Sequence, residues 1–203
     1  MQYNYSYDNN GAGYGLFQYE GTTVWENNII RYNISYNDGE GNDKAGIYMW
    51  TAEPEKDLLR NCKIYNNVFV NEFGYPVKFA MDNHGNVTNP NGFEFYNNIF
   101  IAGEALVYGR HSNSVFSHNA WYHIYGKTIN KSIDPNGYFG NPMINLPWPD
   151  NYRITDPTQL RDLEIFKLLD SSPCIGSGKE ISGDPGKNFR GKSTANPPNI
   201  GAF

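Results

Sequence analysis

The sequence predicts an all-β protein built as a parallel solenoid with a separate C-terminal tail, and three observations support this prediction. The composition is rich in strand and turn formers: of 203 residues, 16% are aromatic, and there are 21 glycines and 12 prolines. An asparagine recurs at one place in successive strand-like segments. A second strand pattern recurs between those segments. Aromatic and β-branched strands divided by turn residues are typical of all-β proteins.

The first repeat is marked by an asparagine that recurs five times. The five residues are Asn4, Asn33, Asn67, Asn98 and Asn119. They are 29, 34, 31 and 21 residues apart, and they lie in runs such as "IYNNVFVN" and "FYNNIFI". Propellers and leucine-rich repeats have more uniform periods. The variable spacing therefore favours a solenoid, in which each coil accepts loop insertions and pairs only with its neighbours.

The second strand pattern occupies residues 13–19, 45–50, 75–80 and 104–109. Each repeat thus holds about three short strands, so residues 1–125 are predicted to form about five coils and three parallel sheets. Strand alternation places one set of side chains of this second strand inside the solenoid. That set is Leu16, Ile47, Val77, Phe79 and Leu106.

A stacked column explains why amides interrupt these apolar strands. Stacked coils place equivalent residues about 4.8 Å apart, so an inward amide can hydrogen-bond the amide of the next coil, as in asparagine ladders. Asn66 and Asn97 precede two of the recurrent asparagines and suit a tight corner, because asparagine tolerates the left-handed conformation. Tyr32 and His118 occupy that place in other coils.

The tail, residues 126–203, begins with a stretch to residue 156 that is dense in turn residues. A short helix is predicted over 157–169, because a capping Asp and a Pro precede apolar residues at helical spacing. We expect its apolar face to cover the open end or the side of the solenoid. Asp184 and Arg190 are predicted to form an ion pair that fastens the tail, and two solvated charges are the alternative.

Charge and cysteine content exclude several classes of protein. The formal net charge is −5 and no Lys/Arg-rich run occurs, so no nucleic-acid partner is expected. No apolar stretch approaches the roughly 18 residues of a membrane span. Cys62 and Cys174 form neither a disulfide framework nor a metal knuckle, and Cys62 is predicted to be a core residue. The polar, strand-like start has no signal-peptide pattern, and we expect further coils upstream of it in a longer protein.

The chain resembles the single-stranded, right-handed parallel β-helix family of pectate-lyase-like proteins. The resemblance rests on the Asn-Asn-aliphatic coils of residues 1–125 and on the tail segments "LLDSSPCIGSG" (168–178), "DPGKNFRG" (184–191) and "PPNIGAF" (197–203). Secreted bacterial members often end in a similar segment, from whose usual residues Cys174, Gly176 and Asn199 depart. The resemblance implies a secreted bacterial protein, extracellular or periplasmic, of which this chain is a C-terminal portion.

The resemblance also implies that a sugar chain lies along the outer face of the sheet formed by the second recurrent strand. The residues expected on that face are Phe17, Tyr48, Lys78 and Val107, flanked by Tyr19 and Trp50. Aromatic rings offer flat apolar faces to sugar rings and polar tips to sugar hydroxyls. The alternative is that these aromatics pack under neighbouring loops.

Lys78, Arg110 and His111 are the candidate catalytic residues. In the family that the chain resembles, several lyases use a lysine or arginine to remove the proton α to a uronate carboxylate. Lys78 could act in this way if nearby cations or burial lower its pKa. Arg110 and His111, one coil along, could bind an acidic substrate or protonate the leaving oxygen. Ordinary surface cations are the alternative for all three. On another face, Lys63 and Glu94 are expected to pair across coils.

Acidic loops border the same predicted groove. The candidate metal ligands are Asp38, Glu40 and Asp43, with Asn42 beside them. Their oxygens at alternating positions suit Ca²⁺, although Asp43 stands where an EF-hand has glycine, and a solvated acidic turn is the alternative. Residues 38–57 carry a local charge of −4, which would repel a polyuronate unless Ca²⁺ bridges it, or could serve hydrolysis by paired carboxylates. Asp82 and His84 are candidate substrate contacts beside the groove.

Two functions remain open at this point. The first is a carbohydrate-active enzyme, a polysaccharide lyase or a glycoside hydrolase, that binds and cleaves a polysaccharide or oligosaccharide. The second is a non-catalytic glycan-binding or structural module, because five coils advance only about 20 Å, which is short for a groove that holds several sugar rings. In both cases the open N-terminal coil could associate with a second copy of the chain.

Overall fold

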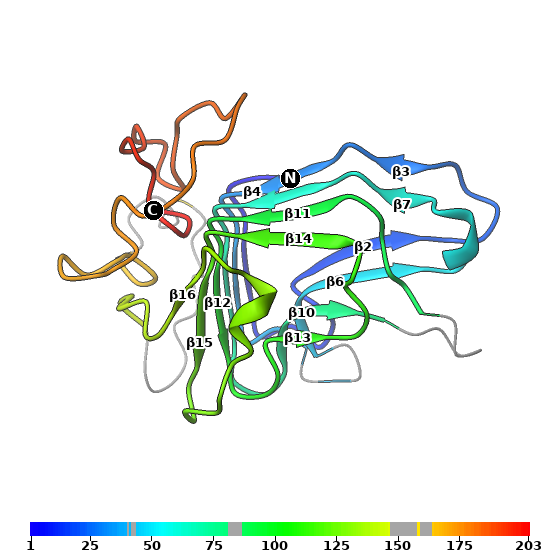
Figure 1. Ribbon diagram of the computed structural model, residues 1–203, viewed down its shortest axis with the longest axis horizontal. Helices are drawn as coiled ribbons and strands as arrows, with labels where there is room; N and C mark the ends of the chain where they lie inside the picture. The colour runs from blue at the N-terminus through cyan, green and yellow to red at the C-terminus, as the bar shows by residue number, and fades with distance from the viewer. Residues whose placement is uncertain (40, 42–43, 81–86, 147–157, 159–163) are drawn as a thin grey trace.

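In the computed structural model, which describes residues 1–39, 41, 44–80, 87–146, 158 and 164–203, the chain is a parallel β-solenoid with almost no helix (Figure 1). Neighbouring strands within the sheets all pair in parallel. Two short 3₁₀ helices lie in the described part of the chain, η1 (Pro54–Lys56) and η2 (Lys131–Ile133). The predicted all-β class and parallel architecture are confirmed.

Successive strands of each coil belong to three different sheets. Sheet 1, in spatial order, contains β14 (Ser114–Ser117), β11 (Phe93–Tyr96), β8 (Lys63–Tyr65) and β4 (Ile29–Arg31). Sheet 2 contains β1 (Tyr5–Tyr7), β5 (Ile34–Tyr36), β9 (Val68–Asn71), β12 (Ile99–Ala102), β15 (Ala120–His123) and β16 (Tyr138–Phe139). Sheet 3 contains β13 (Val107–Tyr108), β10 (Tyr75–Phe79), β6 (Ala45–Thr51) and β2 (Tyr14–Gln18). A two-stranded extension pairs β3 (Trp25–Glu26) with β7 (Leu59–Arg60).

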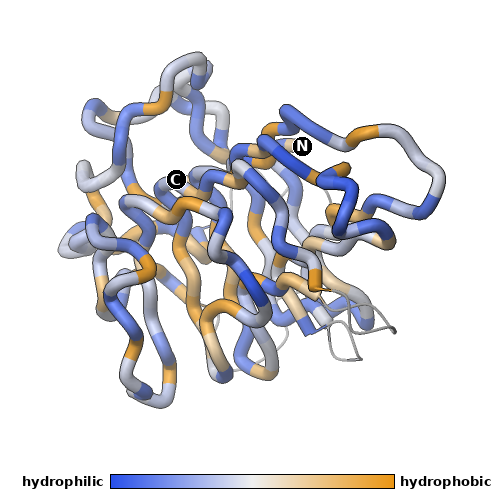
Figure 2. Tube along the Cα trace, turned by 45° about the vertical axis from the view of Figure 1, so that its right-hand side comes forward, coloured by the Kyte–Doolittle hydropathy of each residue, from blue (hydrophilic) through white to orange (hydrophobic). Residues whose placement is uncertain are grey.

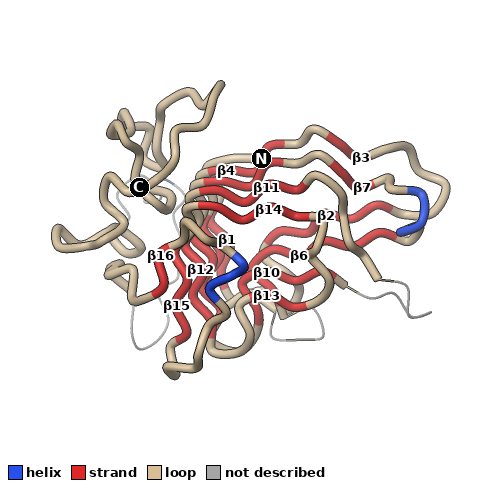
Figure 3. Tube along the Cα trace, viewed as in Figure 1, coloured by secondary structure: helices blue, strands red, loops and turns tan. Residues whose placement is uncertain are grey.

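Three coils contribute a strand to all three sheets: β4–β5–β6, β8–β9–β10 and β11–β12–β13. The pairs β1–β2 and β14–β15 are incomplete coils at either end (Figure 3). The predicted five coils are therefore three complete coils with a partial one at each end. In the described part of the chain no strand of sheet 3 follows β15, because the chain passes through η2 and returns to sheet 2 as β16.

The inward side chains of the coils form an aromatic core. Phe69, Phe100 and Trp121 are register partners on sheet 2 and are fully buried. Their ring centroids are 5.8 Å apart from Phe69 to Phe100 and 4.6 Å apart from Phe100 to Trp121. Cys62 lies in the same core, as predicted. Figure 2 shows apolar residues concentrated along the stacked strands and hydrophilic stretches in the projecting loops. Each such buried ring contributes about 1.5–3 kcal/mol through the apolar surface it removes from water.

The recurrent asparagines form the predicted hydrogen-bonded column, the asparagine ladder. Asn33, Asn67, Asn98 and Asn119 are 0% exposed. At each step the backbone N and the side-chain Nδ2 of one asparagine donate to the Oδ1 of the next. The distances are 3.2 and 2.8 Å from Asn4 to Asn33, and 2.9 or 3.0 Å at the three later steps. All the amides therefore point the same way along the solenoid.

The ladder ends on a buried carboxylate that the sequence did not predict. Asp134, on the segment that follows η2, is 0% exposed. Its Oδ2 accepts hydrogen bonds from N and Nδ2 of Asn119, both at 2.9 Å, so it takes the place of a sixth asparagine. The same carboxylate accepts from the backbone N of His118 and from Nε1 of Trp121, both at 3.1 Å. One acidic side chain thus satisfies four donors at the end of the column.

The residue before each ladder asparagine turns the corner of its coil in the left-handed conformation. The φ angles are 59° at Tyr3, 50° at Tyr32, 51° at Asn66, 53° at Asn97 and 59° at His118. The prediction for Asn66 and Asn97 is confirmed. Their side chains also bind the tail: Asn66 Nδ2 donates to the carbonyl oxygens of Asn199 and Gly201, both at 2.9 Å. The backbone N of Lys179 donates to Asn97 Oδ1 at 2.7 Å.

The tail packs on the outer face of sheet 2, so it covers a side of the solenoid (Figure 1). Ile34, Val68 and Ile99 each follow a ladder asparagine and point away from the core into this interface, where they are fully buried. The same buried cluster contains the tail residues Ile144, Phe166, Leu168, Cys174 and Ile200. Sheet 2 is therefore buried on both faces, which accounts for its continuous apolar strands.

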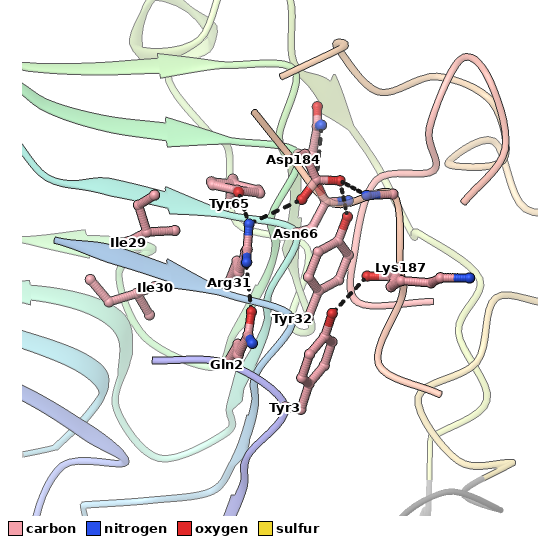
Figure 4. Close-up of polar contacts among 12 residues, drawn as sticks. Gln2, Tyr3, Ile29, Ile30, Arg31, Tyr32, Tyr65, Asn66, Asp184 and Lys187 are labelled. Atoms are coloured by element: carbon pink, nitrogen blue, oxygen red, sulfur yellow. Dashed lines mark hydrogen bonds and ion pairs between the residues drawn. The ribbon is translucent and has the colours of Figure 1, made fainter. Parts of the chain in front are cut away.

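The predicted ion pair between Asp184 and Arg190 is wrong. Asp184 lies over the solenoid corner instead, where its carboxylate accepts a hydrogen bond from the Tyr32 hydroxyl at 2.8 Å and lies 3.5 Å from Nη1 of Arg31 (Figure 4). Burial and this hydrogen bond raise the pKa of Tyr32 well above its usual range, so the phenol remains a donor. Arg190 pairs with Glu164 at 2.9 Å. The partner of Asp184 lies more than 150 residues away in the sequence, and the local charge pattern does not reveal such contacts.

The helix predicted over residues 157–169 falls largely on residues 157 and 159–163, which lie outside the described part of the chain. Residues 164–169 are described and are not helical. They contain a turn, followed by an isolated antiparallel bridge between Leu168 and Ile144. Phe166 is fully buried against sheet 2. Within residues 164–169, the apolar Phe166 and Leu168 therefore lie on an irregular segment docked against sheet 2 and not on a helix.

Candidate functional site

The outer face of sheet 3 carries a row of aromatic residues around one lysine. Lys78 on β10 is the register partner of Tyr48 on β6 and of Tyr108 on β13. Phe17 on β2 is the partner of Trp50 on β6. Because side chains alternate along a strand, these positions share the face opposite the buried Val77. We call this surface the aromatic face; it consists of Phe17, Tyr19, Tyr48, Trp50, Tyr75, Lys78 and Tyr108.

The predicted membership of this face is correct except at β13. Val107 was predicted to point outward, but it pairs with the inward Val77 and packs against the core. Tyr108 occupies the outward place and is 39% exposed. A shift of one residue in register moves a side chain to the opposite face, and a strand of two residues offers too little pattern to set that register. Tyr75 was also missed: alternation gives it the parity of the buried Val77, but its ring contacts the ring of Tyr108.

The rings of the aromatic face form two groups in contact, one on each side of Lys78. Ring centroids are 5.3 Å apart for Phe17 and Tyr48, and 6.4 Å apart for Phe17 and Trp50. Tyr19 lies 5.2 Å from Trp50 and is 60% exposed. These are edge-to-face contacts, which aromatic pairs favour. A second pair, Tyr75 and Tyr108, lies 4.7 Å apart on the other side of Lys78. Exposed apolar surface of this extent is typical of a binding site.

Lys78 is held at the centre of this face. Its Nζ lies 4.5 Å from the centroid of the Tyr48 ring, in a cation–π contact, and the side chain is half-buried. Such contacts contribute about 0.5–2 kcal/mol, more as they lose solvent. The stem of the lysine therefore lies along the aromatic surface, and its charged head is positioned at the middle of the row.

The other two candidate catalytic residues, Arg110 and His111, lie on the segment that follows β13. Arg110 is exposed on the segment after β13. The His111 ring stacks on the core residue Phe79 at 6.2 Å and meets Phe116 edge-on at 5.9 Å. His111 thus packs over the end of the solenoid core. On sheet 1, Lys63 Nζ lies 3.9 Å from Glu94 Oε2, which confirms the predicted pair across coils.

The candidate metal ligand Asp38 is engaged by donors of the protein. It is 1% exposed, and it accepts hydrogen bonds from Nδ2 and N of Asn9 at 2.7 and 3.1 Å and from the Ser35 hydroxyl. Glu40 and Asp43, the other predicted ligands, lie outside the described residues, as do the predicted substrate contacts Asp82 and His84. Within the described residues, no cluster of three His, Cys, Asp or Glu side chains could hold a metal ion.

Lysine and arginine residues partly neutralise the acidic run after Asp38. Glu53 forms an ion pair with Lys56, and its Oε2 accepts a hydrogen bond from the backbone N of Gly21 at 3.1 Å. Asp57 lies 4.0 Å from Arg60. The hydrogen bond to Gly21 ties the loop that carries η1 to the preceding coil, and the two ion pairs stabilise the loop locally. In these contacts Glu53 and Asp57 each face a basic side chain, and neither is paired with a second carboxylate as a hydrolase would require.

We expect the substitution Asp38→Asn to leave the protein at least as stable as the native chain at pH 7. Burial is the main cause that raises the pKa of Asp38, partly opposed by hydrogen bonds from Ser35 and Asn9. Because the pKa of Asp38 is raised on folding, its protonated form stabilises the folded protein. That contribution to the free energy of unfolding is lost as the pH rises through the pKa that Asp38 has in the folded state. An asparagine can accept from Asn9 and donate to Ser35 without a buried charge.

Urea unfolding at several pH values would test this expectation. The stability of the Asp38→Asn variant relative to the native chain should increase as the pH rises from about 4, the ordinary value for an aspartate, towards neutrality. Asp38→Ala should lose about 2 kcal/mol because both sets of donors are left without an acceptor. An Asp38→Asn variant that is clearly less stable at pH 7 would show that the charge itself is needed.

Comparisons with known proteins do not assign the chain to a family. No family model and no curated protein sequence matches it. The described residues contain no helix with the length and hydrophobicity needed to cross a membrane.

Proposed function

We propose that the chain binds a polysaccharide or oligosaccharide along the aromatic face of sheet 3. The observation that carries this proposal is the set of rings on four neighbouring strands, β2, β6, β10 and β13, which lie in two groups on either side of Lys78. Four strands span about 14 Å at the usual strand spacing, which suits a short stretch of a glycan. Flat apolar faces bind sugar rings, and the tyrosine hydroxyls and the lysine serve their polar groups.

The proposal predicts that Trp50→Ala weakens glycan binding by about 10- to 100-fold, as expected when a central aromatic contact is lost. Trp50 contacts both Phe17 and Tyr19, so its loss opens the middle of the row. A glycan array would identify a bound oligosaccharide, and calorimetry would give the affinities. Tyr125→Ala is the control, because Tyr125 is an exposed aromatic residue outside the face. Equal affinity of the native chain and the Trp50→Ala variant would overturn the proposal.

A second proposal is that the same face cleaves its glycan, with Lys78 as the base of an eliminative lyase reaction. Its support is the central, half-buried position of Lys78. Lys78→Ala should then abolish the absorbance of unsaturated products, while Lys63→Ala, a cation on sheet 1, should leave it intact. Turnover that survives in the Lys78→Ala variant would exclude this residue as the base. Binding without any turnover in the native chain would favour the non-catalytic module. Cleavage that gives no unsaturated products would favour a glycoside hydrolase.

The wider setting is likewise a proposal. The tail segments at residues 168–178, 184–191 and 197–203 resemble the ends of secreted bacterial β-helix proteins. They support a pectate-lyase-like origin, an extracellular or periplasmic location, and a role of this chain as the C-terminal part of a longer solenoid. Detection of the native protein in the culture medium or periplasm of its source would test the location.

A further inference from the structure

A cavity of about 410 Å³ opens where the solenoid core ends, on the inner side of β13. It is lined by residues 104–107, His111, Trp121, His123, residues 127–130 and Ile133. The cavity exists because β13 is the last strand of sheet 3 in the described chain, and the segment from Ile124 to Asp134 crosses the end of the core only partly. Its volume equals that of about a dozen water molecules.

The floor of the cavity is apolar. Trp121 and Leu106 are buried members of the solenoid core, and the half-buried Ile129 and Ile133 pack against the same core. A pocket of this size, mostly apolar with a few polar groups, is typical of a site for a small molecule. The aromatic face lies on the opposite side of β13, where Tyr108 points outward.

One buried side chain in this cavity has a ring nitrogen without a hydrogen-bond partner in the described chain. His123 is the register partner of the inward Ala102 and is 5% exposed. Its Nδ1 lies 3.2 Å from the backbone N of Tyr125 and accepts that hydrogen bond, so Nε2 carries the ring proton. No group in the described chain hydrogen-bonds Nε2. Burial, and next the charge of Lys127, lower the pKa of His123, while the Glu104 backbone opposes this, so the ring is neutral at pH 7.

We propose that the cavity binds a small aromatic carboxylate, whose ring lies on Trp121 and Leu106 and whose carboxylate accepts a hydrogen bond from His123 Nε2. Lys127 is exposed at the cavity and supplies a positive charge for the same carboxylate. Glu104 is the only acid among the described lining residues, and it is also exposed, where water screens its repulsion. An unpaired buried donor gains more from a charged acceptor than from a neutral one.

Calorimetric titration of the full chain tests the proposal with phenylacetate and 3-phenylpropionate as probes, and with 3-phenylpropionamide and 3-phenylpropanol as uncharged counterparts. We expect both carboxylates to bind with a dissociation constant of about 0.1–1 mM, as suits ligands of this size. The uncharged compounds should bind about tenfold more weakly. Failure of both carboxylates to bind at about 10 mM would overturn the proposal.

Variants assign the contacts. His123→Ala should weaken binding of 3-phenylpropionate at least about tenfold, whereas His123→Asn, which keeps a donor as Asn71 does on β9, should lose less. Lys127→Ala should weaken binding about threefold at low salt and Glu104→Gln should tighten it slightly, since both residues are exposed. Lys131→Ala is the control, because Lys131 lies over Phe139 and does not line the cavity. Unchanged affinity in both folded variants, at His123 and at Lys127, would show that binding does not use this cavity.

Discussion

Asp134→Ala is expected to lower the free energy of unfolding by about 4 kcal/mol or more. The substitution leaves several buried donors without an acceptor, and each unpaired donor costs about 1–3 kcal/mol. Four donors converge on this carboxylate: the backbone N of His118, N and Nδ2 of Asn119, and Nε1 of Trp121. All of their distances are 2.9–3.1 Å. Alanine removes the acceptor of all four at once.

The direction of the asparagine ladder explains why its last member is an acid. Each asparagine donates towards the C-terminal end of the solenoid and accepts from the N-terminal side. The amide dipoles are therefore aligned, and the end of the column presents only donors. A carboxylate is the one side chain that offers acceptors without a competing donor, and its negative charge suits the positive end of aligned dipoles.

Asp134→Asn separates the acceptor from the charge. The asparagine oxygen can take the place of Oδ2 and still accept from Asn119 and Trp121, but the amide nitrogen then faces the backbone N of His118. We therefore expect a loss of about 2 kcal/mol, between the native chain and Asp134→Ala. Urea denaturation followed by circular dichroism would rank the three proteins. If Asp134→Asn matched the native chain, the column would need only one acceptor at its end, and the argument from aligned dipoles would fail.

The sequence allowed the interior of the solenoid to be predicted better than its edges. Asn33, Asn67 and Asn98 each precede a β-branched aliphatic residue in a strand pattern, so their column could be inferred from this repeat. Asp134 could not, because the last step exchanges the amide for a carboxylate in a segment without a strand pattern. A spacing of 15 residues from Asn119, shorter than any earlier step, gave no signal of a sixth member.

The aromatic face was predicted in the long strands and missed in the short one. β6 spans seven residues, so alternation identified Tyr48 and Trp50 as outward. β13 spans two, and there Val107 was chosen in place of Tyr108. His111 was considered as a candidate site residue because it follows the second strand pattern one coil along. In the structure its ring packs against Phe79 and Phe116, where the core ends. Side chains pack in this way only at the last coil of the solenoid. A local sequence pattern does not show which coil is the last.

The two adjacent asparagines Asn66 and Asn67 are expected to differ strongly in their contribution to stability. We expect Asn67→Ala to lower the free energy of unfolding by about 3–5 kcal/mol and Asn66→Gly to lower it by about 1 kcal/mol. Asn67 accepts from N and Nδ2 of Asn33, and its own Nδ2 donates to the Ile30 carbonyl, the Tyr65 carbonyl and Asn98 Oδ1. Alanine removes the acceptor of the buried backbone N of Asn33 and every hydrogen bond donated by Nδ2, in the middle of the solenoid.

Asn66 differs because its side chain faces the tail. Glycine adopts its φ of 51° without strain, so Asn66→Gly removes only the hydrogen bonds to the carbonyls of Asn199 and Gly201 and the weaker one from Asn97. The expected result is local: faster amide exchange and proteolysis in the last residues of the tail, with the unfolding of the solenoid nearly unchanged. Asn67→Ala should instead lower protection in β5, β9 and β12 together, because each coil is satisfied by the next. Equal effects of the two substitutions, in size and in place, would mean that the ladder asparagines contribute no more than the corner does.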